Sequence, residues 1–343
     1  MNIIYNLAFL LLFQFSIAFD QALELPQLSP QLDSQGTEKR DMAAESNIVF
    51  KSTDGGQTWR DIGKGLPEDL EREIVKVDPQ VGRIEDFVNS GGIYLRAGNG
   101  LYHYESNSTT SFWEKETFPD KMSSIAFGKT GIFAYNYGGQ IVQKTKGTNV
   151  WSPVYTNFKG TVRTVFETAG GTVFIGSENG LFKSTNSGKT WKHVHVGGWV
   201  IKLVESNGVL MATSMSGIIR STDDGETWAL VISEGGVGID IERIEGGFAA
   251  ITYNTKSETR RVRTSYDGGK TWQPIDAGLP ASPLIASIIQ VGENLFCGHP
   301  NGIYKSSDKG KTWKLLLPSI DGKVFNLSVS GNVIYAIPRN GGC

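Results

Sequence analysis

The sequence contains little cysteine and no excess of charge of either sign. Its two cysteines, Cys297 and Cys343, are too few for a disulfide framework or a four-thiolate zinc site. Two alternatives stay open: a single bridge between them or, as we favour, a buried thiol at Cys297 and a loose one at Cys343. The 33 Lys and Arg against 35 Asp and Glu give a net charge of −2. Because no basic excess exists to neutralise phosphates, nucleic acid is not an expected partner.

Long hydrophobic runs are absent too, except at the start of the chain. Residues 1–19 carry no charge, and Ser16 and Ala18 are small residues of the kind that a signal peptidase reads. We predict a signal peptide at residues 1–18, with a retained membrane anchor as the competing interpretation. Residues 19–46 contain Pro, Gln and mixed charges, which is typical of a flexible linker. The protein is therefore expected to be secreted, or periplasmic in the cell envelope, with no stable membrane span after cleavage.

Glycine, in contrast, is abundant. It accounts for 42 of 343 residues, or about 12%, where about 7% is average. Only 12 prolines accompany it. Glycine spread evenly along a chain supplies tight turns, and many tight turns imply many short strands. This composition excludes a helical bundle.

Five segments of the chain repeat the pattern S-x-[DN]-x-G-x-T-W. They occupy residues 52–59, 184–191, 221–228, 265–272 and 306–313. With these residues the chain resembles the Asp-box (BNR) repeat family, which includes sialidases, sortilin-type receptors and photosystem assembly factors. The resemblance implies a β-propeller whose Asp boxes lie on the blade periphery, away from any active site.

The tryptophans extend the repeat over the whole chain after residue 46. Seven of the eight, all but Trp199, end a repeat unit, and two decayed units end at Trp113 and Trp151. Each unit contains four short strand-like stretches, which match the four antiparallel strands of a propeller blade. The chain begins with a third strand and ends with a first and a second strand. We therefore predict an all-β, seven-bladed β-propeller over residues 47–343, closed by N- and C-terminal half-blades.

The polar residue of each Asp box is predicted to have a structural role. Asp, Asn and Ser side chains satisfy the backbone amides of a hairpin turn, and the glycine permits a positive φ. The tryptophan fills space between neighbouring sheets. The polar residues concerned are Asp54, Asn186, Asp223, Asp267 and Asp308.

The candidate binding residues lie around the central axis, where propellers hold their ligands. Aligning the first strands of the units on their apolar positions gathers polar residues into a funnel at this axis. Arg163 and Arg243 occupy matching places in the alignment, so both are expected to face the same axis. The candidate ligand-binding residues are Glu85, Asp86, Arg96, Arg163, Lys202, Glu242, Arg243, Tyr253 and Arg339.

No complete catalytic or metal-binding motif accompanies this scaffold. Gly188-Lys189-Thr190 resembles the end of a phosphate loop, but Lys183 stands where that loop needs a glycine. His193 and His195 share one face of a strand but lack a third ligand nearby. We therefore expect no cofactor and no metal site, and no residue is assigned a catalytic role.

Two functions are compatible with these observations. The favoured hypothesis is an exported, non-catalytic propeller that binds or scaffolds a protein segment or a glycan through its central funnel. The alternative is a sialidase-like glycoside hydrolase that acts on an anionic sugar. The resemblance to sialidases implies an arginine triad, a tyrosine nucleophile assisted by Glu, and an Asp acid/base. The Phe/Tyr-Arg-Ile-Pro segment that precedes the first Asp box of sialidases is missing from this sequence.

Overall fold

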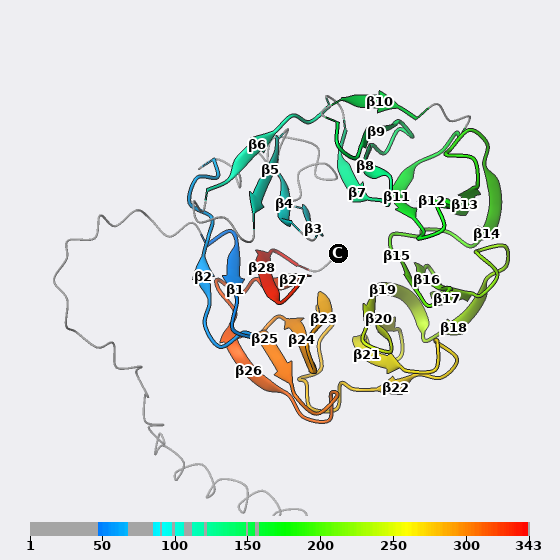
Figure 1. The fold of residues 1–343 in the computed structure, drawn as a ribbon. Coiled ribbons are helices and arrows are strands. Elements are labelled where there is room, and N and C mark those ends of the chain that lie inside the picture. The colour runs from blue at the N-terminus through cyan, green and yellow to red at the C-terminus, as the bar shows by residue number, and fades with distance from the viewer. Residues whose placement is uncertain are drawn as a thin grey trace, which may run out of the picture. The chain divides into compact units, whose positions relative to one another are not determined.

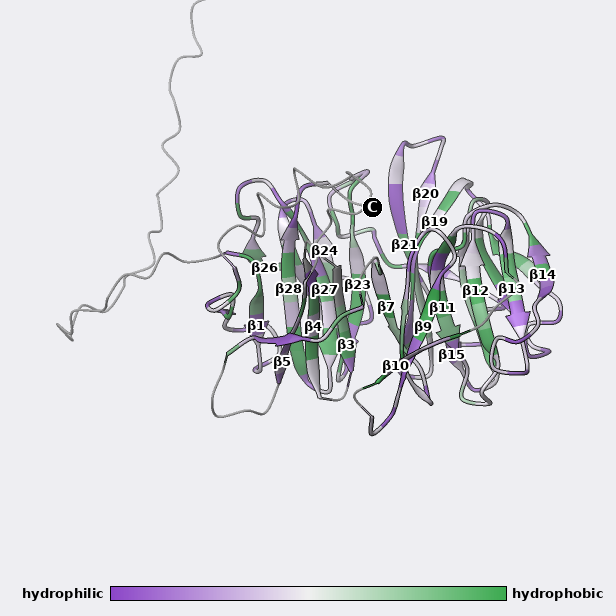
Figure 2. Ribbon diagram, turned by 90° about the horizontal axis from the view of Figure 1, so that it is seen from above, coloured by the Kyte–Doolittle hydropathy of each residue, from purple (hydrophilic) through white to green (hydrophobic). Residues whose placement is uncertain are grey.

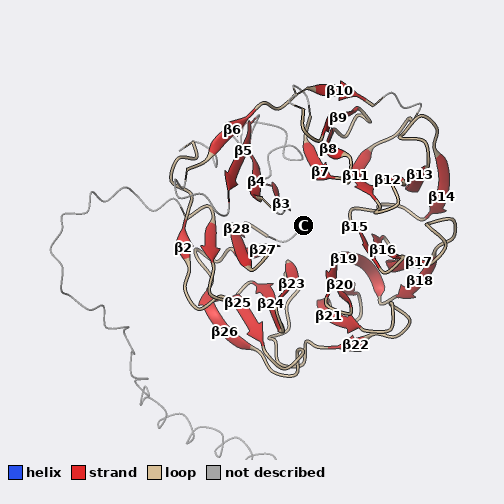
Figure 3. Ribbon diagram, in the orientation of Figure 1, coloured by secondary structure: helices blue, strands red, loops and turns tan. Residues whose placement is uncertain are grey.

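The computed structural model describes residues 47–67, 85–89, 91–97, 100–105, 112–119, 122–148, 150–154 and 158–341. The predicted signal peptide and linker, residues 1–46, lie outside this part of the chain, as does Cys343. Within the described ranges, strands form seven four-stranded antiparallel sheets arranged around a central axis (Figure 1). No helix occurs among the described residues (Figure 3). The predicted seven-bladed β-propeller is confirmed.

One blade, the clasp blade, joins the two ends of the propeller. Its four strands are β1 (Phe50–Ser52), β2 (Arg60–Asp61), β27 (Val324–Ser330) and β28 (Val333–Arg339). β1 pairs with β28, with Phe50 opposite Ala336 and Ser52 opposite Ile334. The early third strand and the late second strand are therefore neighbours, as the half-blade pattern predicted.

The other six blades are continuous in sequence and are numbered 2 to 7 in chain order. Blade 2 contains β3 (Glu85–Asn89), β4 (Gly92–Ala97), β5 (Gly100–Glu105) and β6 (Glu114–Glu116). Blade 3 contains β7 (Ser124–Phe127), β8 (Gly131–Tyr135), β9 (Ile141–Thr145) and β10 (Trp151–Pro153). Blade 4 contains β11 (Val162–Glu167), β12 (Val173–Ser177), β13 (Gly180–Ser184) and β14 (Lys192–Val196).

The last three blades follow the same plan. Blade 5 contains β15 (Leu203–Ser206), β16 (Val209–Ser214), β17 (Gly217–Ser221) and β18 (Ala229–Ile232). Blade 6 contains β19 (Gly235–Ile244), β20 (Gly247–Asn254), β21 (Thr259–Ser265) and β22 (Gln273–Pro274). Blade 7 contains β23 (Ser287–Val291), β24 (Asn294–His299), β25 (Gly302–Ser306) and β26 (Lys314–Pro318).

The hydrophobic core lies in the seams between neighbouring blades. Between blades 4 and 5, for example, Phe174 and Leu181 pack with Leu203 and Ala212. Because each sheet has a neighbour on both faces, its middle strands bury side chains on both faces. All five residues of β12 are buried for this reason, which explains why this strand is not an alternating apolar and polar run.

The ring has two faces that differ in what they carry. We call one of them the entry face: here the first strand of each blade begins, and the second strand turns into the third. We call the other the Asp-box face: here the third strand turns into the fourth. β20 and β21 are eight and seven residues long, and their hairpin extends past the neighbouring blades on the entry face (Figure 2).

The Asp boxes occupy the turns predicted for them. Asp54 accepts hydrogen bonds from Thr58 N at 3.0 Å, from Thr58 Oγ1 at 2.6 Å and from Ser52 Oγ at 2.9 Å. These bonds, with Thr58 first, lower the pKa of Asp54 to about 2 because they stabilise the charged form. Asn186 accepts the equivalent bond from Thr190 N at 2.9 Å. Asp223, Asp267 and Asp308 repeat the carboxylate arrangement.

The box glycine also joins each blade to the preceding one. Gly225 of blade 5 has a φ of +77°, and a Cβ there would lie 2.4 Å from Cζ of Phe174 in blade 4. Gly269 of blade 6 has a φ of +79°, and a Cβ there would lie 1.6 Å from Cε of Met211 in blade 5. Only glycine suits both the turn and the contact. The box therefore stabilises the seam as well as its own hairpin.

Candidate functional site

Tyr137, Arg163, Glu178 and Trp199 form a cluster at the inner rim of the entry face, which we call the Trp199 cluster. The guanidinium carbon of Arg163 lies 5.0 Å from the ring centroid of Tyr137 and 4.4 Å from that of Trp199. Arg163 Nη2 lies 2.8 Å from Glu178 Oε1. The cation therefore stacks on two aromatic rings and pairs with one carboxylate.

The Trp199 cluster is continued by exposed apolar side chains. Trp199 lies in the connection from β14 to β15 and is 48% exposed, and Met215 in the turn from β16 to β17 is 46% exposed. Val196 and Ile201, on either side of Trp199 in sequence, are exposed as well. A Cβ on Gly198 would lie 2.8 Å from Met215 Cγ, so the connection packs against this turn. The connection next to the Arg163 cation and the turn that it packs against therefore expose several apolar side chains.

A second charged group lies at the hub between blades 5 and 6. Lys202 Nζ is 2.7 Å from Asp240 Oδ1 and also bonds Glu242. Burial lowers the pKa of Lys202, but the two carboxylates outweigh it and raise that pKa above its ordinary value. The predicted residues Lys202 and Glu242 thus form an ion pair, and Asp240 is a second partner of Lys202. Because their charges are mutually satisfied, this triad joins two blades rather than attracting a ligand.

The other predicted residues are spread over the ring. Glu85 and Asp86 begin β3, and their side chains lie outside the described part. Arg96 is only 2% exposed, which favours a role inside the scaffold. Arg339 ends β28, and Tyr253 lies in the extended β20 strand opposite Arg260.

The predicted equivalence of Arg163 and Arg243 is wrong. Arg243 pairs with Phe248, one position before the turn from β19 to β20, and is exposed on the Asp-box face. Arg163 lies at the start of β11 on the entry face. β19 is ten residues long and has two register shifts, between Gly235 and Gly238 and between Gly238 and Asp240. The apolar pattern was therefore matched three residues too late, and the two arginines do not share one site.

Four residues of these two groups are absent from the predicted set of binding residues: Tyr137, Glu178, Trp199 and Asp240. Trp199 did carry a signal, because it is the one tryptophan outside the repeat position. A bulky aromatic residue that the scaffold does not require is a candidate for recognition. Asp240 was missed because of the same register error that misplaced Arg243.

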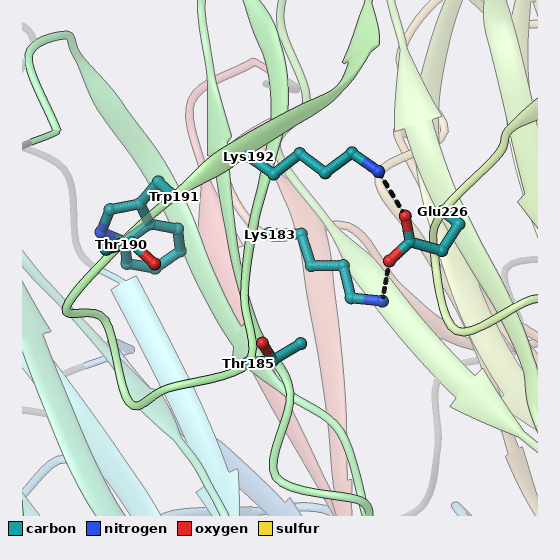
Figure 4. A pocket seen from close by; sticks show the side chains of 6 residues that line it. All are labelled: Lys183, Thr185, Thr190, Trp191, Lys192 and Glu226. Carbon is teal, nitrogen blue, oxygen red and sulfur yellow. Dashed lines mark hydrogen bonds and ion pairs between the residues drawn. The ribbon is translucent and has the colours of Figure 1, made fainter.

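A shallow pocket lies on the periphery of blade 4, beside the Asp box of blade 5. Figure 4 shows Lys183 and Lys192 pointing to the two carboxylate oxygens of Glu226, at 2.8 and 2.6 Å. The two lysines hold the pKa of Glu226 below its usual range. Thr185, Thr190 and Trp191 complete the lining. Since Glu226 already satisfies both cations, we assign this pocket to the seam and not to a ligand.

The remaining candidate chemistry is limited among the described residues. His193 stacks on Phe182 with ring centroids 4.2 Å apart, and no three His, Cys, Asp or Glu side chains of the described ranges gather in a metal-like group. Cys297 is a free, buried thiol whose pKa burial raises. The described part of the chain contains no helix with the length and apolar character needed to cross a membrane.

Comparison with known sequences identifies the repeat. The BNR/Asp-box repeat model matches residues 263–274, which overlap the box of blade 6. None of the curated proteins matches this sequence. The resemblance inferred from the five S-x-[DN]-x-G-x-T-W segments is thereby confirmed.

Comparison with solved structures shows the same fold in proteins of different activities. YCF48 bound to D1 peptide matches with a TM-score of 0.53 and 15% identity, over 76% of this chain and 94% of that one. The extracellular domain of a hybrid two component system from B. thetaiotaomicron matches with a TM-score of 0.57 and 13% identity, over 78% and 39%.

An ancestral GH74 enzyme matches with a TM-score of 0.55 and 14% identity, over 76% of this chain and 44% of the enzyme. The chain therefore spans less than half of the GH74 enzyme and of the two component domain. At these identities the likeness shows the fold, and the function has to be argued from the site.

Proposed function

We propose that this seven-bladed Asp-box (BNR) β-propeller is an exported binding protein that holds a protein segment on its entry face, at the Trp199 cluster. The observation that carries the proposal is the exposed indole of Trp199, stacked on one side against Arg163. Exposed aromatic side chains next to a rigidly held arginine are typical of binding hot spots. The exported location follows from the predicted signal peptide and agrees with a similar fold in an extracellular domain.

The surroundings of Trp199 favour a protein segment over a glycan. The connection that carries the indole is flanked in sequence by Val196 and Ile201 and packs against Met215 at Gly198, and all three side chains are exposed and apolar. An apolar side chain of a partner gains free energy by covering them, whereas sugar hydroxyls would lose hydrogen bonds to water there. Arg163 adds polar specificity, because a guanidinium has five N–H donors and only Nη2 is engaged by Glu178. A main-chain carbonyl or carboxylate of the segment would use the remaining Nη donors, since Nε is buried.

A similar fold supports the binding of a peptide without defining the partner or the face. The YCF48 structure contains a bound peptide, which shows that a propeller of this type can hold one. The hydrolase alternative gains no support from the geometry, since Arg163 and Arg243 lie on different faces. Arg96 is buried, so its guanidinium is not open to a sugar carboxylate.

The proposal is tested by screening the full-length protein on an arrayed library of random peptides, on a glycan array and with a fluorogenic sialoside. Peptides that bind should contain apolar side chains, and Trp199→Ala should weaken them at least about tenfold, as expected for a hot-spot residue. Tyr266→Ala is the matched control, because Tyr266 is equally exposed at 48% but belongs to an Asp box. It should leave binding unchanged.

The outcomes separate the functional classes. If the protein binds glycans but not peptides, and if Trp199→Ala abolishes this binding, the proposed site is correct but the partner is a glycan. Sialoside turnover would replace the binding protein with an enzyme. Peptide binding that survives both Trp199→Ala and Arg163→Ala would show that the segment lies elsewhere on the ring.

A further inference from the structure

The outer strands of the blades differ in how their free edges are protected. The fourth strand of each blade has a neighbour on one side only, so alternate N–H and C=O groups face solvent along its other side. Charged residues and proline block pairing at such an edge. Residues of these kinds occur in β2 (Arg60, Asp61), β6 (Glu114, Lys115, Glu116), β10 (Pro153), β14 (Lys192), β22 (Pro274) and β26 (Lys314, Pro318).

The strand β18 of blade 5 is the described outer strand that lacks this protection. Its residues, Ala229–Ile232, include neither a charged residue nor a proline. Ala229 and Leu230 are exposed, Leu230 at 47%. Ala229 follows the box tryptophan directly, where blade 7 has Lys314. The register shift next to Leu230 does not distinguish this strand, because blades 4 and 7 have the same shift.

The residue after β18 adds a main-chain donor to this edge. Ser233 corresponds to Pro318 of blade 7, because each follows a residue whose carbonyl oxygen faces the first glycine of the third strand. Proline has no N–H, so blade 7 forms without a donor at this position. Ser233 is exposed, and no described residue accepts a backbone hydrogen bond from its N–H. We call Ala229–Ser233 the β18 edge.

The β18 edge is continuous with the connection that carries Trp199. The turn from β16 to β17 contains Met215 and ends at Gly217, and a Cβ there would lie 1.9 Å from Ile232 O. On its other side, Met215 packs against Gly198, next to Trp199. From its first to its fourth strand a blade is about 14 Å wide, which about five extended residues span. A segment held at Trp199 therefore reaches β18 by crossing blade 5 (Figure 1).

We propose that the protein segment held at the Trp199 cluster continues as an extended apolar strand and adds to the β18 edge as the fifth strand of blade 5. This inference rests on the proposed function and specifies how its partner is bound. Another extended main chain supplies donors and acceptors at the spacing of the β18 edge. Leu230 favours an apolar side chain in the added strand, since side chains directly opposite each other pack together.

A second copy of this chain fits the β18 edge less well than a slender segment. β18 is four residues long and lies on the outer wall of the ring (Figure 1). A stable interface between two folded proteins needs about 20–30 residues from each partner. A segment that is already held at Trp199 does not need this area, because its second contact forms within the same complex.

Two substitutions close the β18 edge, and the probe is the tightest-binding peptide from the library described above. Ser233→Pro and Ala229→Lys each introduce the residue that blade 7 has at the same position, so both variants should fold. Each should weaken the peptide about tenfold in a calorimetric titration of the full-length protein. Gln273→Lys is the matched control, because it adds the same charge at the same position of blade 6. It should leave binding unchanged.

Copies of the peptide that each carry one N-methyl group test the main-chain pairing with the wild-type protein. Every second N–H of an added strand donates to the edge, so methylation should weaken binding about tenfold at alternate positions of the segment. A methylation profile without this alternation overturns the strand addition.

The variants separate the failure of this inference from that of the proposed function. Binding that Trp199→Ala weakens and Ser233→Pro does not overturns the strand addition and keeps the entry-face function. Binding that Ser233→Pro weakens and Trp199→Ala does not keeps the strand addition and overturns the entry-face function. A library without a binding peptide overturns both.

Discussion

The two faces of this propeller are built by different rules. On the Asp-box face, five turns follow one plan. Four residues carry an acceptor for both the amide and the hydroxyl of the Thr four residues on: Asp54, Asp223, Asp267 and Asp308. In blade 4, Asn186 accepts from the amide of Thr190 and donates to its hydroxyl. On the entry face the blades differ more from one another, although blades 4 and 5 share the hydrogen bonds of Ser177 and Ser214 in the turn between their second and third strands. Among the described residues, the Trp199 cluster occurs once, between blades 3 and 5, and the extended hairpin belongs to blade 6 (Figure 2).

This difference teaches where to search for function in a repeat protein. A residue that recurs in every unit answers a demand that every unit shares, and in a propeller that demand is to close a hairpin and join the next blade. Trp228 does both: its indole donates to Gly225 O at 3.1 Å and its ring packs on Phe174 of the preceding blade. Trp199 does neither, and it is exposed.

The two tryptophans give the strongest test of the comparison. Trp228→Ala should lower the free energy of unfolding by about 3 kcal/mol, because it removes a large side chain from a seam. Trp199→Ala should lower it by less than about 1 kcal/mol, since only an exposed stacking contact with Arg163 is lost. Urea denaturation of both variants measures the two losses. Equal losses would mean that Trp199 is also part of the scaffold.

Two glycines test whether the Asp box joins blades or only shapes its own turn. Gly225→Ala should cost about 2 kcal/mol more than Gly208→Ala, because its Cβ would meet Phe174 of blade 4 at 2.4 Å. Gly208 is the control: it has a similar φ of +73° and nothing within 4 Å. Both variants carry the strain of a positive φ, so their difference in urea denaturation isolates the contact between blades. If the two losses are the same, the box acts only within its hairpin.

We expect mild acidification to destabilise the protein through His299, which lies on the entry face. Its Nε2 donates to Pro280 O at 2.9 Å and its Nδ1 accepts from Asn301 N at 3.1 Å. Burial lowers the pKa of His299, against the bond to Pro280. The stabilisation is therefore complete above the ordinary pKa of 6.5 and is lost as the pH falls below it. Melting temperatures measured between about pH 7 and pH 5 should fall more steeply in the wild type than in His299→Gln.

The Asp boxes should lose their stabilising effect only in stronger acid. We expect the substitution of a single box aspartate to have the smallest effect of the variants described here. The pKa of Asp54 is lowered from 3.8 to about 2, so its stabilisation is complete above pH 3.8 and is lost as the pH falls through about 2. Asp54→Asn should flatten the acid dependence of the melting temperature in this window. Asn186 shows that an amide fits the same turn, so the variant should fold. An unchanged acid profile would contradict the role of the ionised carboxylate.

The pattern of residues predicted much of the fold but less of the candidate site. The S-x-[DN]-x-G-x-T-W segments and the tryptophan spacing predicted seven blades and the clasp, because each blade is a local unit of about forty residues. The same pattern misplaced Arg243, since the bulges near Gly238 in β19 are invisible to it. Lys202 and Glu242 were both predicted near the axis, but their meeting with Asp240 was not.

The sequence by itself determined the strands, the turns and the number of blades. These depend on interactions within a hairpin or between units of the same pattern, so a periodic sequence records them. The tertiary structure alone decided that Arg163 lies between Tyr137 and Trp199, and that Lys183 pairs with Asp224 and Glu226 of the next blade. Both arrangements bring together side chains of different blades. Their meeting depends on strand register and on the closure of the ring, which have no counterpart in the local order of residues.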